Sequence, residues 1–284
     1  MKIFDFRLRP PYKGYAKLGL YNPVPCNETA PQKWHAEPSR AAEEKSLDLF
    51  WKEMDEAGIS GGVVIGRQMP DDSASVPNDD IIGMAREFPD KIVAFGGLDV
   101  SRGVSAAMDE LERCLELGVR GMGMEPAYCQ PPRYADANVL YPIYARCEKA
   151  GIPVMLTLSF FQGNLDYSDP VAVQRVAQDF PNLQLILAHA CYPWLLHVVN
   201  LCLIQKNIWL LPDLYMLNPT APGNQMYGDA MRWLNGERIL FGSAYPCYTM
   251  KQAVRDIERF GLSDELKEKF FHGNAEKLLG TLPC

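Results

Sequence analysis

The sequence predicts an α/β protein built as a (β/α)8 TIM barrel. Eight short apolar runs, rich in Val, Ile, Leu and Phe, alternate with eight helical patterns along 284 residues. Continuous apolar runs are typical of parallel strands that are buried on both faces. Eight such units in alternation favour a closed barrel over an open sheet, and barrels of this length commonly form one domain.

Each element follows from a local pattern. The apolar runs predict strands near residues 2–9, 61–66, 91–98, 119–125, 153–159, 183–189, 208–214 and 238–244. Helical periodicity predicts helices near residues 40–57, 78–88, 104–117, 138–150, 169–180, 193–206, 224–235 and 249–260. Glycines such as Gly118 and Gly151 stand where such helices end, and Asp169 followed by Pro170 suits a helix start. A last helix near 263–280 is expected to close over the barrel.

The chain shows no internal repeat and no linker, so residues 1–284 are expected to form a single domain. One connection, residues 10–38, is long and rich in Pro, Tyr, Asn and Gly, without a helix or strand pattern. Long connections of this kind in compact domains are usually lids, substrate-binding loops or interface segments. Because it leaves the end of the first strand, a lid over the barrel mouth is expected.

Composition excludes several classes of protein. The net charge of -7 argues against a surface that binds a nucleic-acid backbone. No apolar run approaches the roughly 20 residues needed to cross a bilayer, so no membrane association is expected. The eight cysteines lack paired spacing, which favours reduced thiols over a disulfide framework. The N-terminus enters a strand pattern directly, and a cytoplasmic protein is expected.

Polar residues follow most of the apolar strands. In a barrel of this kind the chemistry lies at the carboxyl ends of the strands. The residues at those ends are Arg7 and Arg9, Arg67, Asp99, Glu125, Thr157 and Ser159, His189, Asp213 and Tyr215, and Ser243 and Tyr245. This set indicates an active-site rim, and Tyr215 and Tyr245 are expected to contact the substrate.

Arg7 and Arg9 are two residues apart, so they project from the same side of the first strand, together with Asp5. Guanidinium groups stay protonated and cannot ligate a metal. They are suited to binding a carboxylate or an oxyanion through paired hydrogen bonds. The alternative is structural: an internal network of ion pairs with Asp5, Glu125 and Asp213.

His189 and two carboxylates could perform acid–base chemistry. A histidine with an ordinary pKa near 6.5 suits proton transfer. Asp213 or Glu125 could orient His189, act as general base, or neutralise Arg7 or Arg9. A third alternative joins Glu125, His189 and Asp213 in a site for one divalent cation such as zinc. The nearby arginines oppose that site, so no cofactor is the leading expectation. A nucleophilic role for Cys191 or Cys247 is less favoured.

Three segments together resemble the amidohydrolase superfamily, in its amidohydrolase-2 branch of lactonases, decarboxylases and related hydrolases. They are the first strand Ile3-Phe4-Asp5-Phe6-Arg7-Leu8-Arg9-Pro10, the late strand Ile239-Leu240-Phe241-Gly242-Ser243-Ala244-Tyr245-Pro246 and the segment His272-Gly273-Asn274-Ala275 near the end. The resemblance covers nearly the whole chain and implies a TIM barrel. It also implies that the chain could form a homo-oligomer.

The resemblance breaks down at the metal ligands. In that branch the first strand normally ends His-x-His and the late strand ends Gly-Ser-Asp-Tyr-Pro, whereas this chain has Arg7, Arg9 and Ala244. The fifth strand normally carries another histidine near its end, where this chain has Thr157 and Ser159. His189 alone keeps the family's pattern. The family's usual metal site is therefore expected to be absent.

These expectations combine into one leading function. The chain is expected to be a hydrolase or lyase that acts without the family's metal on a small carboxylate-bearing substrate such as a lactone. Arg7 and Arg9 would bind the anion, and His189 would be the acid or base. One alternative is a metal-dependent decarboxylase or hydrolase with the Glu125, His189 and Asp213 site. Another is a non-catalytic barrel that binds an anionic ligand.

Overall fold

The computed structural model describes residues 1–21, 36–159 and 164–283. These residues form two compact units. Unit 1 comprises Met1–Val64, Ala85–Val93 and Pro212–Cys284, and unit 2 comprises Ile65–Met84 and Ala94–Leu211. The seven strands follow one another in the sheet in the order β1 to β7. The prediction that residues 1–284 form one domain stays a prediction.

In unit 1, strand β1 (Ile3–Leu8) pairs in parallel with β2 (Ile59–Ile65), and all six residues of β1 are buried. Helices α2 (Arg40–Glu43) and α3 (Leu47–Glu56) precede β2. The predicted single helix over 40–57 is wrong, because two serines each start a helix. Ser39 accepts a hydrogen bond from the Ala42 amide, and Ser46 accepts one from Leu49.

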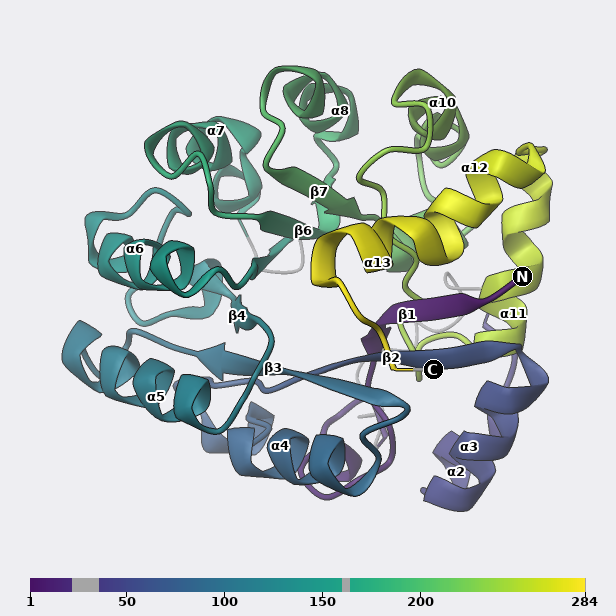
Figure 1. The fold of residues 1–284 in the computed structure, drawn as a ribbon, viewed down its shortest axis with the longest axis horizontal. Helices are drawn as coiled ribbons and strands as arrows, with labels where there is room; N and C mark the ends of the chain where they lie inside the picture. Colours follow the sequence, from purple (N-terminus) through teal and green to yellow (C-terminus); the bar gives the residue numbers. More distant parts are fainter. Residues whose placement is uncertain (22–35, 160–163, 284) are drawn as a thin grey trace. The chain divides into compact units, whose positions relative to one another are not determined.

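Unit 1 also holds the end of the chain, from α9 (Asp213–Leu217) through α10 (Met226–Trp233) and α11 (Met250–Asp256) to the last helices. The predicted final helix is three pieces: α12 (Asp264–Glu268), a π-helical turn η9 (Lys269–Gly273) and α13 (Asn274–Leu279). In Figure 1 this yellow helical run lies beside the purple strand β1. Phe270 and Phe271 from the π-helical turn pack on Phe241 with ring centroids 5.6 and 5.0 Å away.

The predicted eighth strand over 238–244 is wrong, since no regular strand forms there among the described residues. One ladder-like bond remains, from the Phe6 amide to the Phe241 carbonyl at 2.9 Å. The other donors are diverted: the Phe241 amide binds the Phe270 carbonyl, and the Ser243 amide binds the Asp5 side chain. Ala244 then turns the backbone away with a φ of 56°.

Unit 2 contains a parallel array of β3 (Ile92–Leu98), β4 (Met122–Met124), β5 (Val154–Ser159), β6 (Leu185–Tyr192) and β7 (Ile208–Leu211), with the first residues of β3 in unit 1. Helices α5 (Val104–Glu116), α6 (Tyr141–Ala150), α7 (Pro170–Asp179) and α8 (Leu195–Ile204) lie on the outer side of these strands (Figure 1). Helix α4 (Asn78–Glu87) precedes β3. These strands and helices agree with the predicted alternation.

A close backbone approach in unit 2 depends on two glycines and one asparagine. A Cβ on Gly97 would lie 2.3 Å from the Gly66 carbonyl oxygen, and a Cβ on Gly66 would lie 2.8 Å from the Gly97 nitrogen, so both positions require glycine. Asn78 binds Gly97 twice: its Oδ1 accepts from the Gly97 amide at 2.6 Å, and its Nδ2 donates to the Gly97 carbonyl at 3.0 Å. This contact brings the start of α4 against the carboxyl end of β3.

Candidate functional site

Alternate residues of β1 carry the charges in unit 1. Asp5 and Arg7 are almost completely buried, and Arg9, one residue beyond the strand, is half-buried. Side chains two apart on a strand lie on the same face, as the sequence predicted. The structure therefore gathers Asp5 and Arg7 inside unit 1 and leaves Arg9, one residue beyond the strand, partly exposed.

Asp5 is held by amides and not by an arginine. Its Oδ1 accepts hydrogen bonds from the Arg7 amide at 2.8 Å and from the Ser243 amide at 3.1 Å. Its Oδ2 has no hydrogen-bond partner among the described residues. Burial raises the pKa of Asp5 to about 6, although the hydrogen bonds from Ser243 and Arg7 lower it. Asp5 is thus poised to change its charge close to neutral pH.

Arg7 pairs with Asp213. The Arg7 Nε lies 3.6 Å from Asp213 Oδ2, and both side chains are shielded from solvent. Asp213 is predicted to lie at the end of a strand. In the structure it is instead the first residue of α9, two residues after β7. It has a φ of 28°, and its Oδ1 accepts from the Leu214 amide at 2.6 Å. The left-handed backbone is unusual for a non-glycine residue and places the carboxylate against the guanidinium.

Within unit 1, a series of hydrogen bonds connects Arg9 to Glu53. The Tyr21 hydroxyl donates to the Arg9 carbonyl, and the Arg9 Nη1 donates to the Tyr245 carbonyl at 3.4 Å. The Tyr245 hydroxyl lies 3.0 Å from Ser39 Oγ, which donates to Glu53 Oε2 at 2.8 Å. Burial raises the pKa of Tyr245, and its hydrogen bonds with Ser39 and Tyr21 lower it. We call Arg9, Tyr21, Tyr245, Ser39 and Glu53 the arginine relay.

The arginine relay changes the interpretation of two predicted features. Tyr245 was predicted to contact substrate, but its hydroxyl is occupied in the relay and its ring packs edge-on against Phe50 at 5.2 Å. Residues 10–38 were predicted to be a lid. Tyr15 and Tyr21 from that segment are buried instead, whereas residues 22–35, including Trp34 and His35, lie outside the described part.

Two more residues of unit 1 lie close to these charges. Tyr215, predicted to bind substrate, is buried in α9, where its carbonyl accepts from Asn224 Nδ2 at 2.8 Å. Cys247 is half-buried within the electrostatic influence of Arg9, Arg7 and Asp213. Burial raises the pKa of its thiol and Arg9 lowers it. A thiol with a raised pKa is a poor nucleophile at neutral pH.

In unit 2, Glu125 pairs with an arginine that the sequence did not suggest as its partner. Arg67 donates Nε to Oε1 at 2.7 Å and Nη2 to Oε2 at 3.1 Å, a bidentate pair. Its Nη1 also donates to the Ala74 carbonyl, and its guanidinium lies 5.5 Å from the Tyr128 ring centre. The predicted alternative, in which Glu125 neutralises Arg7 or Arg9, is not what the structure shows. Both residues follow strand ends, but spacing cannot reveal which pairs form.

His189 lies in a bulge of β6. Thr157 of β5 is opposite Ala188, whereas Ser159 is opposite Tyr192, so β6 has two more residues than β5 between these pairs. His189, Ala190 and Cys191 take up the difference with φ values of 66°, 47° and 52°. Three consecutive left-handed residues store strain, and such strain is concentrated at functional sites. The side chain of His189 is 7% exposed.

The family's metal does not fit the residues present. Arg7 and Arg9 cannot ligate a cation, and Ala244 has no donor atom. Among the residues that the structure describes, no three His, Cys, Asp or Glu side chains gather in a way that could hold a metal ion. Glu125, one predicted ligand of the alternative site, is paired with Arg67.

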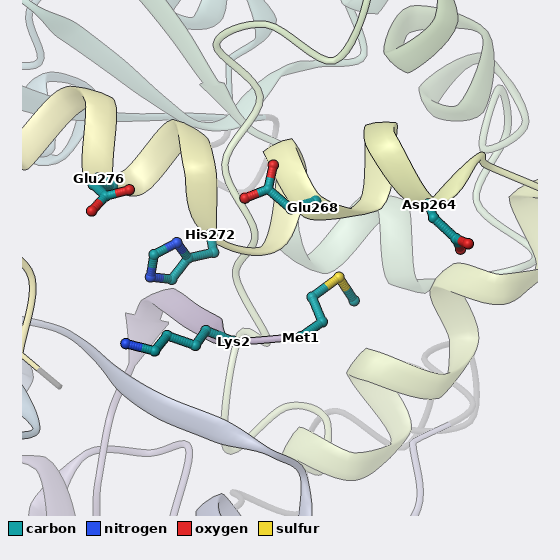
Figure 2. Close-up of a pocket in the computed structure, with 6 residues that line it drawn as sticks. All are labelled: Met1, Lys2, Asp264, Glu268, His272 and Glu276. Carbon is teal, nitrogen blue, oxygen red and sulfur yellow. The ribbon is translucent and has the colours of Figure 1, made fainter.

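A pocket of about 590 Å³ lies at the opposite, amino-terminal end of β1. Figure 2 shows the His272 ring beside Lys2, with Glu268 and Glu276 on the same helical run and Met1 and Asp264 farther along. Its charged residues are largely exposed, and catalytic residues of barrels lie at the carboxyl ends of strands. The pocket is therefore not the candidate site.

Comparisons with known proteins agree with the barrel architecture. A family model described as Amidohydrolase matches residues 9–281 of the chain. No curated protein matches the chain significantly. No helix among the described residues has the length and apolar character to cross a bilayer.

Solved structures confirm the predicted TIM barrel. An uncharacterised TIM-barrel protein from Bordetella bronchiseptica is 34% identical, with 98% of each chain covered and a TM-score of 0.91. A probable 2-pyrone-4,6-dicarboxylic acid hydrolase from Acinetobacter baumannii, with citric acid bound, is 14% identical over 99% of this chain and 100% of its own, with a TM-score of 0.69. The 5-carboxyvanillate decarboxylase of Sphingomonas paucimobilis is 15% identical over 98% of each chain, with a TM-score of 0.67. The last two likenesses show the fold alone.

Proposed function

Since the chain belongs to the amidohydrolase family, we propose that it is a hydrolase of a small carboxylate-bearing substrate, such as a lactone, and uses arginines where the family uses a metal. Members of this fold include a hydrolase and a decarboxylase whose names specify carboxylic acids. The citric acid bound to one of them supports an anionic substrate. A cytoplasmic location is part of the proposal, supported by the six free cysteines of the described residues.

The observation that carries the proposal is the different setting of the two arginines. Arg7 is buried against Asp213, so its charge is fixed in place. Arg9 is half-buried, and among the described residues its side chain makes one long hydrogen bond, 3.4 Å, to the Tyr245 carbonyl. A guanidinium in this setting can form a bidentate pair with an incoming carboxylate. In the proposal Arg9 binds the substrate carboxylate, and Arg7 supplies fixed positive charge for a developing oxyanion.

Proton transfer is assigned to His189. The strained bulge that carries it supports a functional role, since strain persists only where the surroundings enforce it. Asp213 and Glu125 were predicted as catalytic carboxylates. Their pairs with Arg7 and Arg67 favour a positioning role for both, with Asp213 holding Arg7 in its orientation.

The metal-dependent alternative has less support, because Glu125, one of its three predicted ligands, is paired with Arg67. Turnover distinguishes the proposed enzyme from the alternative, a non-catalytic barrel that binds an anion. An assay by mass spectrometry, with lactones and carboxylates and without added cation, is the first measurement. Binding without any product would favour the non-catalytic barrel.

Variants of Arg9 then test the assignment on the substrate that the assay identifies. Arg9→Ala removes a charged hydrogen-bonding group and is expected to lower kcat/KM by about 10- to 100-fold, mainly through KM. Arg9→Lys should recover part of the loss, because it keeps the charge but not the bidentate geometry. Arg40→Ala is the matched control, since Arg40 is exposed and is paired with Glu44 at the surface.

His189→Asn belongs to the same experiment, because asparagine tolerates the left-handed backbone that this position requires. It is expected to lower kcat by about 100-fold or more with little change in KM. Full activity of both Arg9→Ala and His189→Asn would show that the proposed site is wrong.

A further inference from the structure

Helix α8 has an apolar face that nothing in the described structure covers. One side of the helix packs into unit 2 through Leu195, Val198, Val199, Leu201 and Cys202. The other side exposes Leu196 by 60%, Leu203 by 39% and Ile204 by 67%. A surface helix normally has polar and charged residues on its outer face. Contiguous exposed apolar side chains on such a face mark an interaction site.

The exposed face of α8 is self-complementary. Asn200 lies at its centre, with Leu196 and His197 four and three residues before it and Leu203 and Ile204 three and four residues after it. In an antiparallel pair of two copies of this helix, position 196 faces position 204 of the partner, and position 200 faces itself. Leu196 then meets Ile204, His197 meets Leu203 and Asn200 meets Asn200, so the face pairs with itself as an interface with two-fold symmetry requires.

The charges on the face also favour a second copy over other partners. Residues 195–204 include no Lys, Arg, Asp or Glu, so two copies of α8 meet without like-charge repulsion, although the whole chain carries a net charge of -7. A helix that lies on a membrane usually has Lys or Arg along its polar face, which α8 lacks. An acidic or basic partner protein would find no complementary charge here.

Residues beyond α8 extend this face toward the area that a stable dimer buries. Such an interface buries about 800 Å² on each partner, more than one helix of ten residues provides. At the amino-terminal end of α8, the Trp194 indole lies edge-on to His197 and donates to the Leu165 carbonyl at 3.4 Å. Leu165 is itself 43% exposed. In a two-fold pair this extension of each copy meets the far end of the partner's α8, so both ends gain area.

We propose that this chain forms a two-fold dimer in solution through the exposed face of α8, with Asn200 on the symmetry axis. The proposal is independent of the proposed enzymatic function. In this dimer Leu196 of one copy contacts Ile204 of the other, and His197 of one copy contacts Leu203 of the other.

The test is the molar mass of the full-length chain by light scattering across a concentration series. The wild type is expected to be a dimer, and the variant Leu196→Glu with Ile204→Glu is expected to weaken dimerisation at least about 100-fold. Leu20→Glu with Trp233→Glu is the matched control, because it adds the same charge at exposed apolar positions of unit 1. Circular dichroism of all variants checks that they fold.

Asn200→Cys tests the symmetry independently. On the axis, two copies of residue 200 come within disulfide reach, so mild oxidation should yield a covalent dimer that the wild type does not form. Ser105→Cys, at an exposed position of α5, is the control and should not cross-link. A monomeric wild type overturns the proposal. Binding of that monomer to phosphatidylcholine vesicles would point to a membrane as the partner of this face instead. A dimer that persists in the double glutamate variant, or an Asn200→Cys variant that never cross-links, overturns it too.

Discussion

Arg7 and Asp213 show how one substitution at a strand end changes the neighbours that a site needs. A histidine at position 7 could donate a lone pair to a metal, whereas an arginine brings a permanent charge that needs an acid. Asp213 meets that need only because its backbone adopts a φ of 28°. Asp5, on the same strand, stays outside this pair and is held by two amides.

Asp5 gives a pH dependence with a defined sign. Its pKa is raised from 3.8 to about 6 by burial, so the folded state binds this proton more tightly than the unfolded chain does. The stabilising contribution is therefore complete below about pH 4 and is lost as the pH rises through about 6. The loss amounts to up to about 3 kcal/mol.

Asp5→Asn should remove this dependence, because an amide keeps an acceptor for Arg7 and Ser243 but cannot ionise. Urea unfolding of both proteins at pH 4 and pH 7 measures it. The free energy of unfolding of the variant, relative to the wild type, is expected to increase between the two pH values. An unchanged difference would mean that Asp5 titrates normally.

At the scale of elements, the sequence predicted helices and strands well where local signals decide them and poorly where distant groups compete. The two helix starts at Ser39 and Ser46 follow local capping, although periodicity alone merged them into one helix. The last predicted strand fails because the Asp5 carboxylate takes the Ser243 amide, a contact between residues 238 positions apart. The bulge at His189 likewise arises from pairing with β5.

Tyr245→Phe tests the arginine relay. The change keeps the ring contact with Phe50 but removes the hydroxyl that meets Ser39, whose hydroxyl keeps its hydrogen bonds with Glu53 and the Ala42 amide. The loss of this one hydrogen bond is expected to lower the free energy of unfolding by about 0.5–1.5 kcal/mol. Tyr141→Phe is the control: the Tyr141 hydroxyl binds Asp179 at the surface, and its loss should cost less than about 0.5 kcal/mol. Equal effects of the two variants, measured by urea unfolding, would contradict a buried relay.

At the scale of the whole molecule, the chain keeps the scaffold of its family and discards the family's ligands. The barrel needs apolar strands and helices, and the family model matches the chain from residue 9 to residue 281. The metal needs donor atoms at a few strand ends, and arginine or alanine occupies three of them. A fold tolerates such changes because its stability lies in the core and its chemistry in the residues at the strand ends.

Metal removal is therefore expected to leave the protein unchanged. Protein purified without a metal-affinity tag should contain well below one equivalent of zinc or manganese per chain by mass spectrometry. Because Arg7, Arg9 and Ala244 offer no ligands, prolonged dialysis against a chelator should not change the thermal midpoint. One equivalent of metal that survives dialysis, together with a lower midpoint after its removal, would require a ligand set that the sequence does not suggest.

The sequence by itself determined the barrel and its first seven strands, because apolar periodicity and capping act over a few neighbouring residues. Only the tertiary structure decided the partners: Glu125 with Arg67, Arg7 with Asp213, and Tyr245 with Ser39. Ion pairs and hydrogen bonds form between groups that the folded backbone brings within about 3–4 Å, whatever their distance along the chain. The spacing of residues along the sequence does not reveal which of these pairs form.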